Sequence, residues 1–197
     1  DKAQDIIRER GKLVAAKRAD RSATEGVVVS KIVGQKGYML CLACETDFVA
    51  KNSEFSATAN EILDIAIAAD AANLEALNAV AADGRTVADK VTEKSGQTGE
   101  KVELVYYAKI EAPMCVTYIH TNHKLGTLIG FNKEIGMEVA KDVAMQAAAM
   151  APISISREDC DPAVIEHERS IGREQARLDG KPEAMLDKIA EGKVNKF

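Results

Sequence analysis

The chain has 197 residues, of which 46% are hydrophobic, so it is long enough for one or two domains with buried cores. Its formal net charge of −5 argues against a general nucleic-acid-binding protein, which is usually basic. No apolar run reaches the length of about 18 residues that a membrane span needs, and the charged start shows no signal-peptide pattern. The chain starts with Asp1 rather than Met, which suggests a trimmed or partial chain.

The first half of the sequence carries one helix pattern, a strand pair and then further helix patterns. In chain order, we expect these elements at residues 2–18, 26–33, 38–44, 53–69, 73–81 and 86–94. Gly11 weakens the first helix, because glycine is a poor helix former. Ser53 suits the N-cap of the longest helix. The apolar stripe of that helix consists of Phe55, Ala59, Ile62, Leu63, Ala66 and Ile67.

The second half repeats the pattern of a hairpin followed by a helix. We expect a long strand, two hairpin strands and a helix at residues 102–110, 114–121, 126–132 and 134–150. The apolar face of this helix consists of Ile135, Val139, Val143, Ala147 and Met150. The order strand, turn, strand, helix thus occurs twice, at residues 26–70 and 114–150. This suggests an internal duplication, although the same order is also a common local arrangement.

The C-terminal part of the sequence is highly charged and has a helical pattern. Val164, Ile171 and Leu178 recur every seven residues. Gly180 and Pro182 then indicate the end of one helix and the start of the next. The pattern predicts an antiparallel helical hairpin. Its arms are too thinly apolar to form a domain alone, so they either pack on the core or project toward a partner.

Four cysteines raise the possibility of a metal or redox site: Cys41, Cys44, Cys115 and Cys160. Cys41 and Cys44 have the spacing of such a motif, but residues three apart on a strand point to opposite faces. His120 and His123 could add two ligands, yet they lie much further along the chain than in a compact zinc module. We therefore expect structural thiols, with no metal and no cofactor. Free thiols suit a reducing cytosol, so we expect a cytoplasmic protein.

The segment from Cys44 to Lys51 is the most informative part of the sequence. It links the second strand of the first hairpin to the long helix, and surface loops at such junctions often carry function. A Phe at position 48 beside Asp47 is unusual in a solvated turn. Either Phe48 packs under the following helix as a core residue, or it is exposed for contact with a partner.

The six residues Thr46-Asp47-Phe48-Val49-Ala50-Lys51 resemble a specific motif of the elongation factor Ts family. Weaker matches occur on both sides of this motif, in the order in which the family has them. They lie at residues 8–17, 25–27, 124–126, 144–148, 151–152, 180–182 and 191–193. The resemblance implies an α+β fold with two similar ββα-type subdomains built on antiparallel sheets. It also implies an N-terminal helix and a C-terminal helical hairpin that forms a coiled coil. The expected divisions are residues 1–22, 23–100, 101–160 and 161–197. Most of the family's N-terminal helical module, and its C-terminal module, are expected to be missing.

The resemblance also implies which residues meet a partner. In the family, the pair that matches Asp47 and Phe48 inserts near the Mg²⁺ site of the GTPase elongation factor Tu. The expected wedge is Thr46, Asp47, Phe48 and Val49. A second set faces the third domain of the GTPase and consists of Leu125, Gly126, Met145, Gln146 and Met150. A weaker third set, at the hairpin tip, is Gly180, Lys181 and Pro182. Gln146 departs from the family, where His is frequent, and the two methionines could instead fill a core.

We therefore expect a translation elongation factor that promotes GDP release from elongation factor Tu. We expect no direct contact with nucleic acid or membrane, and self-association is possible. An enzyme is not expected, because residues 96–99 lack the Lys-Ser/Thr of a phosphate-binding loop and the three histidines have no evident nucleophile beside them. The alternative is a non-catalytic scaffold that docks through the helical hairpin and binds its partner without releasing nucleotide.

Overall fold

The computed structural model describes the backbone of residues 2–197 and the side chains of residues 6–197. The chain divides into two compact units, Asp1–Met150 and Ala151–Phe197. The larger unit contains helices and antiparallel strands, whereas the smaller unit consists of two helices and the segments around them. The fold is therefore α+β, as the sequence predicts.

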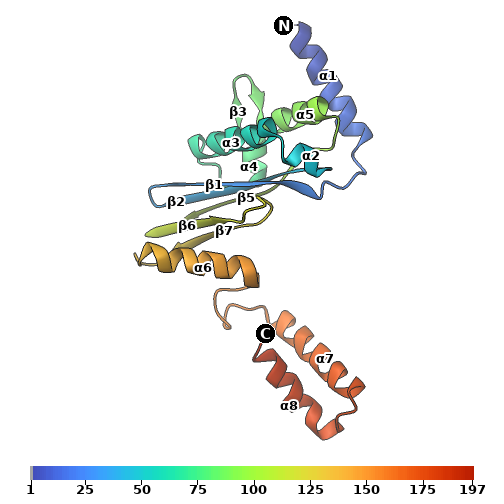
Figure 1. The fold of residues 1–197 in the computed structure, drawn as a ribbon, viewed down its shortest axis with the longest axis vertical. Coiled ribbons are helices and arrows are strands. Elements are labelled where there is room, and N and C mark those ends of the chain that lie inside the picture. The colour runs from blue at the N-terminus through green and yellow to red at the C-terminus, as the bar shows by residue number, and fades with distance from the viewer. Residues whose placement is uncertain (1) are drawn as a thin grey trace. The chain divides into compact units, whose positions relative to one another are not determined.

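The larger unit contains every element that its sequence predicts, together with three shorter ones (Figure 1). Its helices are α1 (Lys2–Lys17), α2 (Asp47–Ala50), α3 (Ser53–Ala68), α4 (Leu74–Ala79), α5 (Val87–Thr98) and α6 (Met137–Met150). Its strands are β1 (Glu25–Val33), β2 (Lys36–Cys44), β3 (Ala81–Ala82), β4 (Arg85–Thr86), β5 (Glu103–Glu111), β6 (Met114–Ile119) and β7 (Gly126–Phe131). The unpredicted elements are α2, β3 and β4, which are too short to give a periodic sequence pattern.

The main core lies between the first sheet and the helices on one of its faces. The sheet is antiparallel in the order β1, β2, β5, and α3, α4 and α5 cover it (Figure 1). The predicted stripe of α3 is confirmed, with Phe55, Ala59, Ile62, Leu63 and Ala66 buried. Leu40 and Leu42 of the central strand belong to the same cluster. The N-cap of α3 is Asn52 rather than the predicted Ser53, because the Asn52 side chain accepts a hydrogen bond from the Glu54 N–H.

The second hairpin, β6 and β7, forms its own two-stranded sheet against the other face of the first sheet (Figure 1). Gly37 of β2 lies directly against the Leu128 side chain of β7 and leaves no space for a Cβ. On the far side of the hairpin, Val116 is buried with Ala140 and Ala144 of α6. The larger unit therefore has four layers, in the order helices, sheet, sheet, helix.

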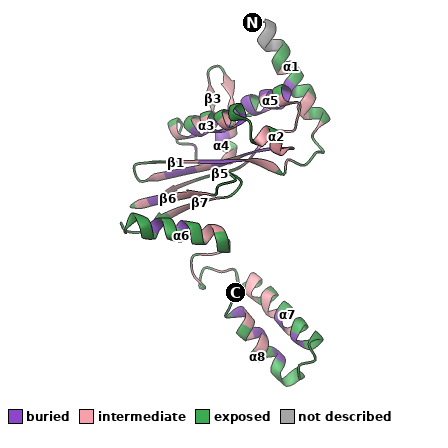
Figure 2. Cartoon of the chain, viewed as in Figure 1, coloured by how far each residue is buried: buried purple, intermediate pink, exposed green. Residues whose placement is uncertain are grey.

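Most of the apolar face predicted for residues 134–150 is wrong, although Ile135 packs partly buried against the cluster beneath α6. Val139 and Val143 are exposed, and Met150 is 69% exposed, whereas the buried residues of this helix are Ala140 and Ala144. The small alanine side chains allow the helix backbone to approach the sheet closely. Figure 2 shows that much of α6 is exposed. The helix thus presents its larger apolar side chains to solvent.

Helices α1 and α5 cross where each carries a glycine. A Cβ added to Gly96 would lie 2.7 Å from the Gly11 Cα, and one added to Gly11 would lie 2.7 Å from the Thr92 carbonyl oxygen. Both distances are far shorter than a normal contact. Gly11, a weak point in the helix pattern, and Gly96 therefore together permit this close crossing.

Strand β5 lies in the first sheet, although it follows the expected subdomain boundary at residue 100. It pairs with β2 and places Tyr107 opposite Leu40, and the register shifts between Cys41 and Leu42. In the first ββα arrangement, β5 thus adds a third strand to the sheet of β1 and β2. The second repeat, β6–β7–α6, has none.

The smaller unit contains α7 (Pro162–Leu178) and α8 (Glu183–Val194), which run antiparallel. Three ion pairs connect the helices in opposite chain order: Arg169–Glu191 at 3.0 Å, Arg173–Asp187 at 2.5 Å and Arg177–Glu183 at 2.9 Å. These side chains are largely exposed, so the pairs contribute little to stability. They therefore mainly define the register of the two helices.

The apolar seam of the smaller unit differs from the predicted heptad on α7, whereas Leu186 and Val194 of α8 are buried, as the sequence predicts. The buried residues are Gly172, Ala176, Leu186, Ala190 and Val194. Ile171 and Leu178 of the predicted heptad are exposed, and Leu178 is 79% exposed. Close helix packing on α7 selects the small residues Gly172 and Ala176, which lie one and two positions from Ile171 and Leu178. Within residues 2–197, no helix combines the length and the hydropathy that crossing a bilayer requires.

Candidate functional site

The segment that joins β2 to α3 forms a one-turn helix, α2, rather than an open loop. Thr46 is its N-cap, and the Thr46 hydroxyl accepts a hydrogen bond from the Val49 N–H at 3.5 Å. At the other end, the Lys51 N–H donates to the Asp47 carbonyl oxygen at 3.0 Å. The motif of residues 46–51 therefore has a defined backbone conformation.

Helix α2 divides its apolar side chains between the core and the solvent. Val49 and Ala50 pack against the main core cluster, whereas Phe48 is 84% exposed. Neighbouring residues on a helix point about 100° apart, so one turn can hold Val49 inward and Phe48 outward. The interpretation of Phe48 as a core residue is therefore wrong, and its ring is free to contact another molecule.

Asp47 carries a negative charge beside the exposed ring. Its Oδ2 accepts a hydrogen bond from Lys51 Nζ at 2.6 Å. This bond lowers the pKa of Asp47 and raises the pKa of Lys51. Both side chains are substantially exposed, so the pair adds little to folding stability. Asp47 thus remains ionised and near the surface at neutral pH.

The backbone ahead of α2 is fixed by two carboxylates that the sequence patterns do not reveal. Glu100 Oε2 accepts from the N–H groups of Glu45 and Thr46, each at 3.0 Å, and its Oε1 accepts from Thr46 Oγ1 at 2.6 Å. Glu45 Oε1 accepts from the Lys101 N–H at 2.6 Å and from Arg18 at 2.9 Å. Because Glu100 lies 54 residues from Thr46, no local signal could have found it.

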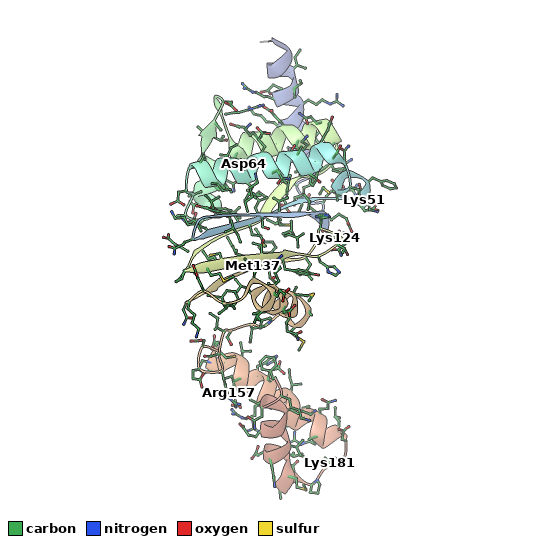
Figure 3. The ribbon with its side chains drawn as sticks, turned by 60° about the vertical axis from the view of Figure 1, so that its left-hand side comes forward. Lys51, Asp64, Lys124, Met137, Arg157 and Lys181 are labelled. Carbon is green, nitrogen blue, oxygen red and sulfur yellow. The ribbon has the colours of Figure 1, made fainter. Side chains whose placement is uncertain are left out.

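A cleft of about 830 Å³ lies beside α2, between β1, α3 and the β6–β7 loop. The loop is tied to β1 by a hydrogen bond from the Val28 N–H to the His123 carbonyl oxygen at 2.7 Å, and by an ion pair between Lys124 and Glu25. Figure 3 places Lys51 and Lys124 on the same side of the unit. The motif and the second hairpin therefore border one cleft.

The second candidate set lies on the β6–β7 hairpin and α6. Its exposed members are Leu125, Met145, Gln146 and Met150. Gly126 is half-buried, and an added Cβ would meet Ile119 and Val28. Thr127 Oγ1 donates to the Ala144 carbonyl oxygen at 2.7 Å, which brings the start of β7 next to the middle of α6. The alternative that the two methionines fill the core is wrong, because both are exposed.

The third candidate set forms the turn between α7 and α8. Gly180 has φ +73°, a left-handed conformation that favours glycine, and its N–H donates to the Arg177 carbonyl oxygen at 3.0 Å. The Lys181 N–H donates to the Ala176 carbonyl oxygen at 3.0 Å. Gly180, Lys181 and Pro182 are all exposed, and Figure 3 labels Lys181 at this turn. The sequence signal for a helix end followed by a restart is confirmed.

The cysteine pair of β2 is separated by the geometry of the strand. Cys44 belongs to the main core, and its thiol donates to the Thr46 carbonyl oxygen at 3.3 Å. Burial raises the pKa of Cys44 to about 12, so it stays a neutral thiol. Cys41 is half-buried and lies outside that cluster. Among the side chains of residues 6–197, no group of three or more His, Cys, Asp or Glu is placed to hold a metal ion.

Comparison with known proteins gives consistent matches. A family model described as Elongation factor TS matches residues 45–197. The elongation factor Ts of Porphyromonas gingivalis is 46% identical over 198 residues, which cover 100% of this chain and 72% of that protein. Those of Azobacteroides pseudotrichonymphae and Cytophaga hutchinsonii are 42% and 43% identical, and this chain again covers 72% of each. The matches cover 100% and 99% of this chain, respectively.

The chain has an α+β fold with an exposed motif between a sheet and a helix. Together with these matches, the fold identifies the chain as a translation elongation factor. The class is one of protein biosynthesis. Within it, the chain belongs to the elongation factor Ts family. The model match includes the whole of α2 and its N-cap, Thr46.

Proposed function

We propose that this chain promotes GDP release from the GTPase elongation factor Tu by inserting Asp47 and Phe48 near its Mg²⁺ and phosphate site. The observation that carries the proposal is the 84% exposure of Phe48 on a capped helical turn. Membership of the elongation factor Ts family supports the choice of partner. We propose a wedge of Thr46, Asp47, Phe48 and Val49, in which Asp47 and Phe48 present their side chains to the partner and Val49 packs inward.

A wedge of this kind needs no nucleophile and no general base. A GTPase holds its nucleotide through phosphate contacts and Mg²⁺, so distortion of that site weakens nucleotide binding. By linkage, a partner that weakens nucleotide binding is itself weakened by the nucleotide to the same degree. The wedge therefore acts by binding the distorted state of the GTPase more tightly than the nucleotide-bound state.

The two side chains of the wedge have different tasks. The Phe48 ring fills an apolar slot between elements of the GTPase, and it loses little conformational freedom because α2 is already formed. Asp47 brings a carboxylate to the magnesium side of the nucleotide site, where it hydrogen-bonds or repels the groups that hold the ion. Lys51 holds this carboxylate in place until the partner arrives.

Two further surfaces support binding. The exposed side of α6 and Leu125 form a second contact, with Met145, Gln146 and Met150 toward the third domain of the GTPase. The turn at residues 180–182 forms a third, weaker contact on a separate compact unit. We place the protein in the cytoplasm with elongation factor Tu as its partner, without direct contact to nucleic acid or membrane.

Release of labelled GDP from purified elongation factor Tu tests the proposal. The account predicts that adding this chain accelerates release, and that excess free GDP weakens the complex. A scaffold that docks through the helical hairpin would bind the GTPase and leave the release rate unchanged. Binding measured on the same samples distinguishes that outcome from a failure to bind.

A further inference from the structure

We propose that Glu100 is a positioning residue for α2, and that its carboxylate keeps Phe48 in the exposed conformation that meets the GTPase. The inference rests on the proposed function of Phe48. It extends that function to a residue outside the 46–51 motif, at the beginning of the segment that leads into β5.

Glu100 concentrates three donors on one carboxylate. The pairing of β2 with β1 ends at Cys44, and α2 begins at Asp47, so the N–H groups of residues 45 and 46 lie between two regular elements. Both N–H groups, together with the Thr46 hydroxyl, donate to Glu100. Hydrogen bonds to a charged acceptor are stronger than neutral ones. Glu100 thus fixes the backbone from which α2 starts.

The Thr46 hydroxyl connects Glu100 to α2 itself. This hydroxyl donates its proton to Glu100 Oε1 at 2.6 Å and accepts from the Val49 N–H. Because the proton points to Glu100, a lone pair faces Val49. The cap distance of 3.5 Å is long, so this hydrogen bond is weak on its own. Without Glu100, the Thr46 hydroxyl is free to rotate, and its oxygen no longer keeps a lone pair directed at the Val49 N–H.

Glu100 is held firmly enough to act on the turn. It follows Gly99, which ends α5 in a left-handed conformation with φ +72°. The buried Ser95 hydroxyl accepts from the Val102 N–H at 3.0 Å and holds the same segment from the other side. In the opposite direction, the Glu45 carboxylate accepts a hydrogen bond from the Lys101 N–H at 2.6 Å. Residues 45–46 and 100–101 therefore hold each other through reciprocal bonds.

An exposed aromatic ring needs such support, because burial of apolar surface is favourable wherever it occurs. The cleft beside α2 is lined by Ala50 and Ile119, among others. A loosely held turn would let the ring of Phe48 fold toward apolar surface and reduce the fraction of molecules ready to bind. Apparent affinity falls in proportion to that fraction. The three hydrogen bonds that Glu100 accepts from Glu45 and Thr46 prevent this loss of binding-competent molecules.

Backbone ¹⁵N relaxation of the free protein tests the positioning role directly. In Glu100→Ala, we expect the order parameters of Phe48 and Val49 to fall from about 0.85 toward 0.6, while those of α3 are unchanged. The matched control is Glu103→Ala, which removes a carboxylate that contacts Lys101 Nζ at 3.3 Å. Unchanged order parameters at Phe48 and Val49 in Glu100→Ala would overturn the proposal. If that variant does not fold, Glu100→Gln, which keeps the side-chain shape, takes its place.

A double-mutant cycle in the GDP-release assay tests the route of action. Glu100→Ala should reduce the efficiency of GDP release about tenfold. This is expected if the fraction of molecules with Phe48 in the exposed, binding-competent conformation falls to about a tenth. In a Phe48→Ala background the same change should add little, since coupled residues are not additive. Full additivity would overturn the proposal. If the unchanged chain releases no GDP, the proposed function fails, and the relaxation measurement still decides whether Glu100 positions α2.

Discussion

Phe48 and Phe55 are seven residues apart in the sequence and lie in opposite environments. Phe48 is 84% exposed on α2, whereas Phe55 is 1% exposed in the main core, on the inward face of α3. The change of environment occurs at Asn52, which follows the motif and caps the next helix. The chain therefore buries Phe55 in its core and exposes Phe48, the residue that we propose contacts the partner.

The first prediction concerns Asp70, which follows α3 and connects it to the sheet. Its carboxylate accepts hydrogen bonds from Lys36 Nζ at 2.9 Å and the Tyr38 hydroxyl at 2.9 Å, and it pairs with Lys109 at 3.2 Å. The Lys36 bond, followed by the Tyr38 bond, holds the pKa of Asp70 well below its ordinary value. A depressed folded-state pKa stabilises the protein above the unfolded-state pKa of about 3.9, and the contribution is lost as the pH falls further.

Asp70→Asn should therefore lower the free energy of unfolding at pH 7, and the difference from the unchanged protein should shrink as the pH falls below about 4. Urea denaturation at pH 7 and pH 3 measures both values. Asp64→Asn, which removes an exposed carboxylate paired with Lys31, is the control for loss of one charge. A difference that stays constant across the pH range would contradict this account of Asp70.

The second prediction concerns the thiols. Cys44 is fully buried, and burial raises its pKa to about 12, so at pH 8 it is neutral and shielded. Iodoacetamide should leave Cys44 unmodified in the folded protein and modify it after denaturation. Cys160 is half-buried and serves as the internal reference in the same mass spectrum. Modification of Cys44 as fast as Cys160 in the folded chain would contradict its placement in the core.

The third prediction concerns the helical hairpin. Because residues 151–197 form a separate compact unit, replacing residues 166–194 with a short linker should leave the larger unit folded. GDP release should become slower without being abolished, since the wedge remains. Circular dichroism and the release assay measure the two effects. Collapse of the larger unit would show that the hairpin belongs to its core.

The sequence predicts those parts of the fold in which a periodic pattern faces a large core. The α3 stripe is the clearest case, because Phe55, Ile62 and Leu63 have no alternative place to bury their side chains. In α6 the same reasoning selects the wrong face. There, Ala140 and Ala144 pack against a small two-stranded sheet, and close backbone approach outweighs side-chain size. Hydrophobic periodicity alone cannot distinguish these two kinds of packing.

The candidate site shows a similar division. The 46–51 motif can be found from the sequence because its residues are contiguous. The role of Glu100 cannot, because it depends on β5 returning beside β2 and on the left-handed turn at Gly99. Whether Phe48 is buried or exposed also depends on the three-dimensional fold, since a four-residue helix has no periodic signal of its own.

The melting temperature and the GDP-release rate of Phe48→Ala, measured on the same sample, test the central claim most directly. We predict a nearly unchanged melting temperature and a loss of about 30-fold in release efficiency, as expected for an anchor worth about 2 kcal/mol. Tyr106→Ala, which removes a ring that is 74% exposed on β5, should preserve both values, and Phe55→Ala should cost about 3–5 kcal/mol of folding stability. A large drop in the melting temperature of Phe48→Ala, with release preserved in the folded fraction, would contradict the account.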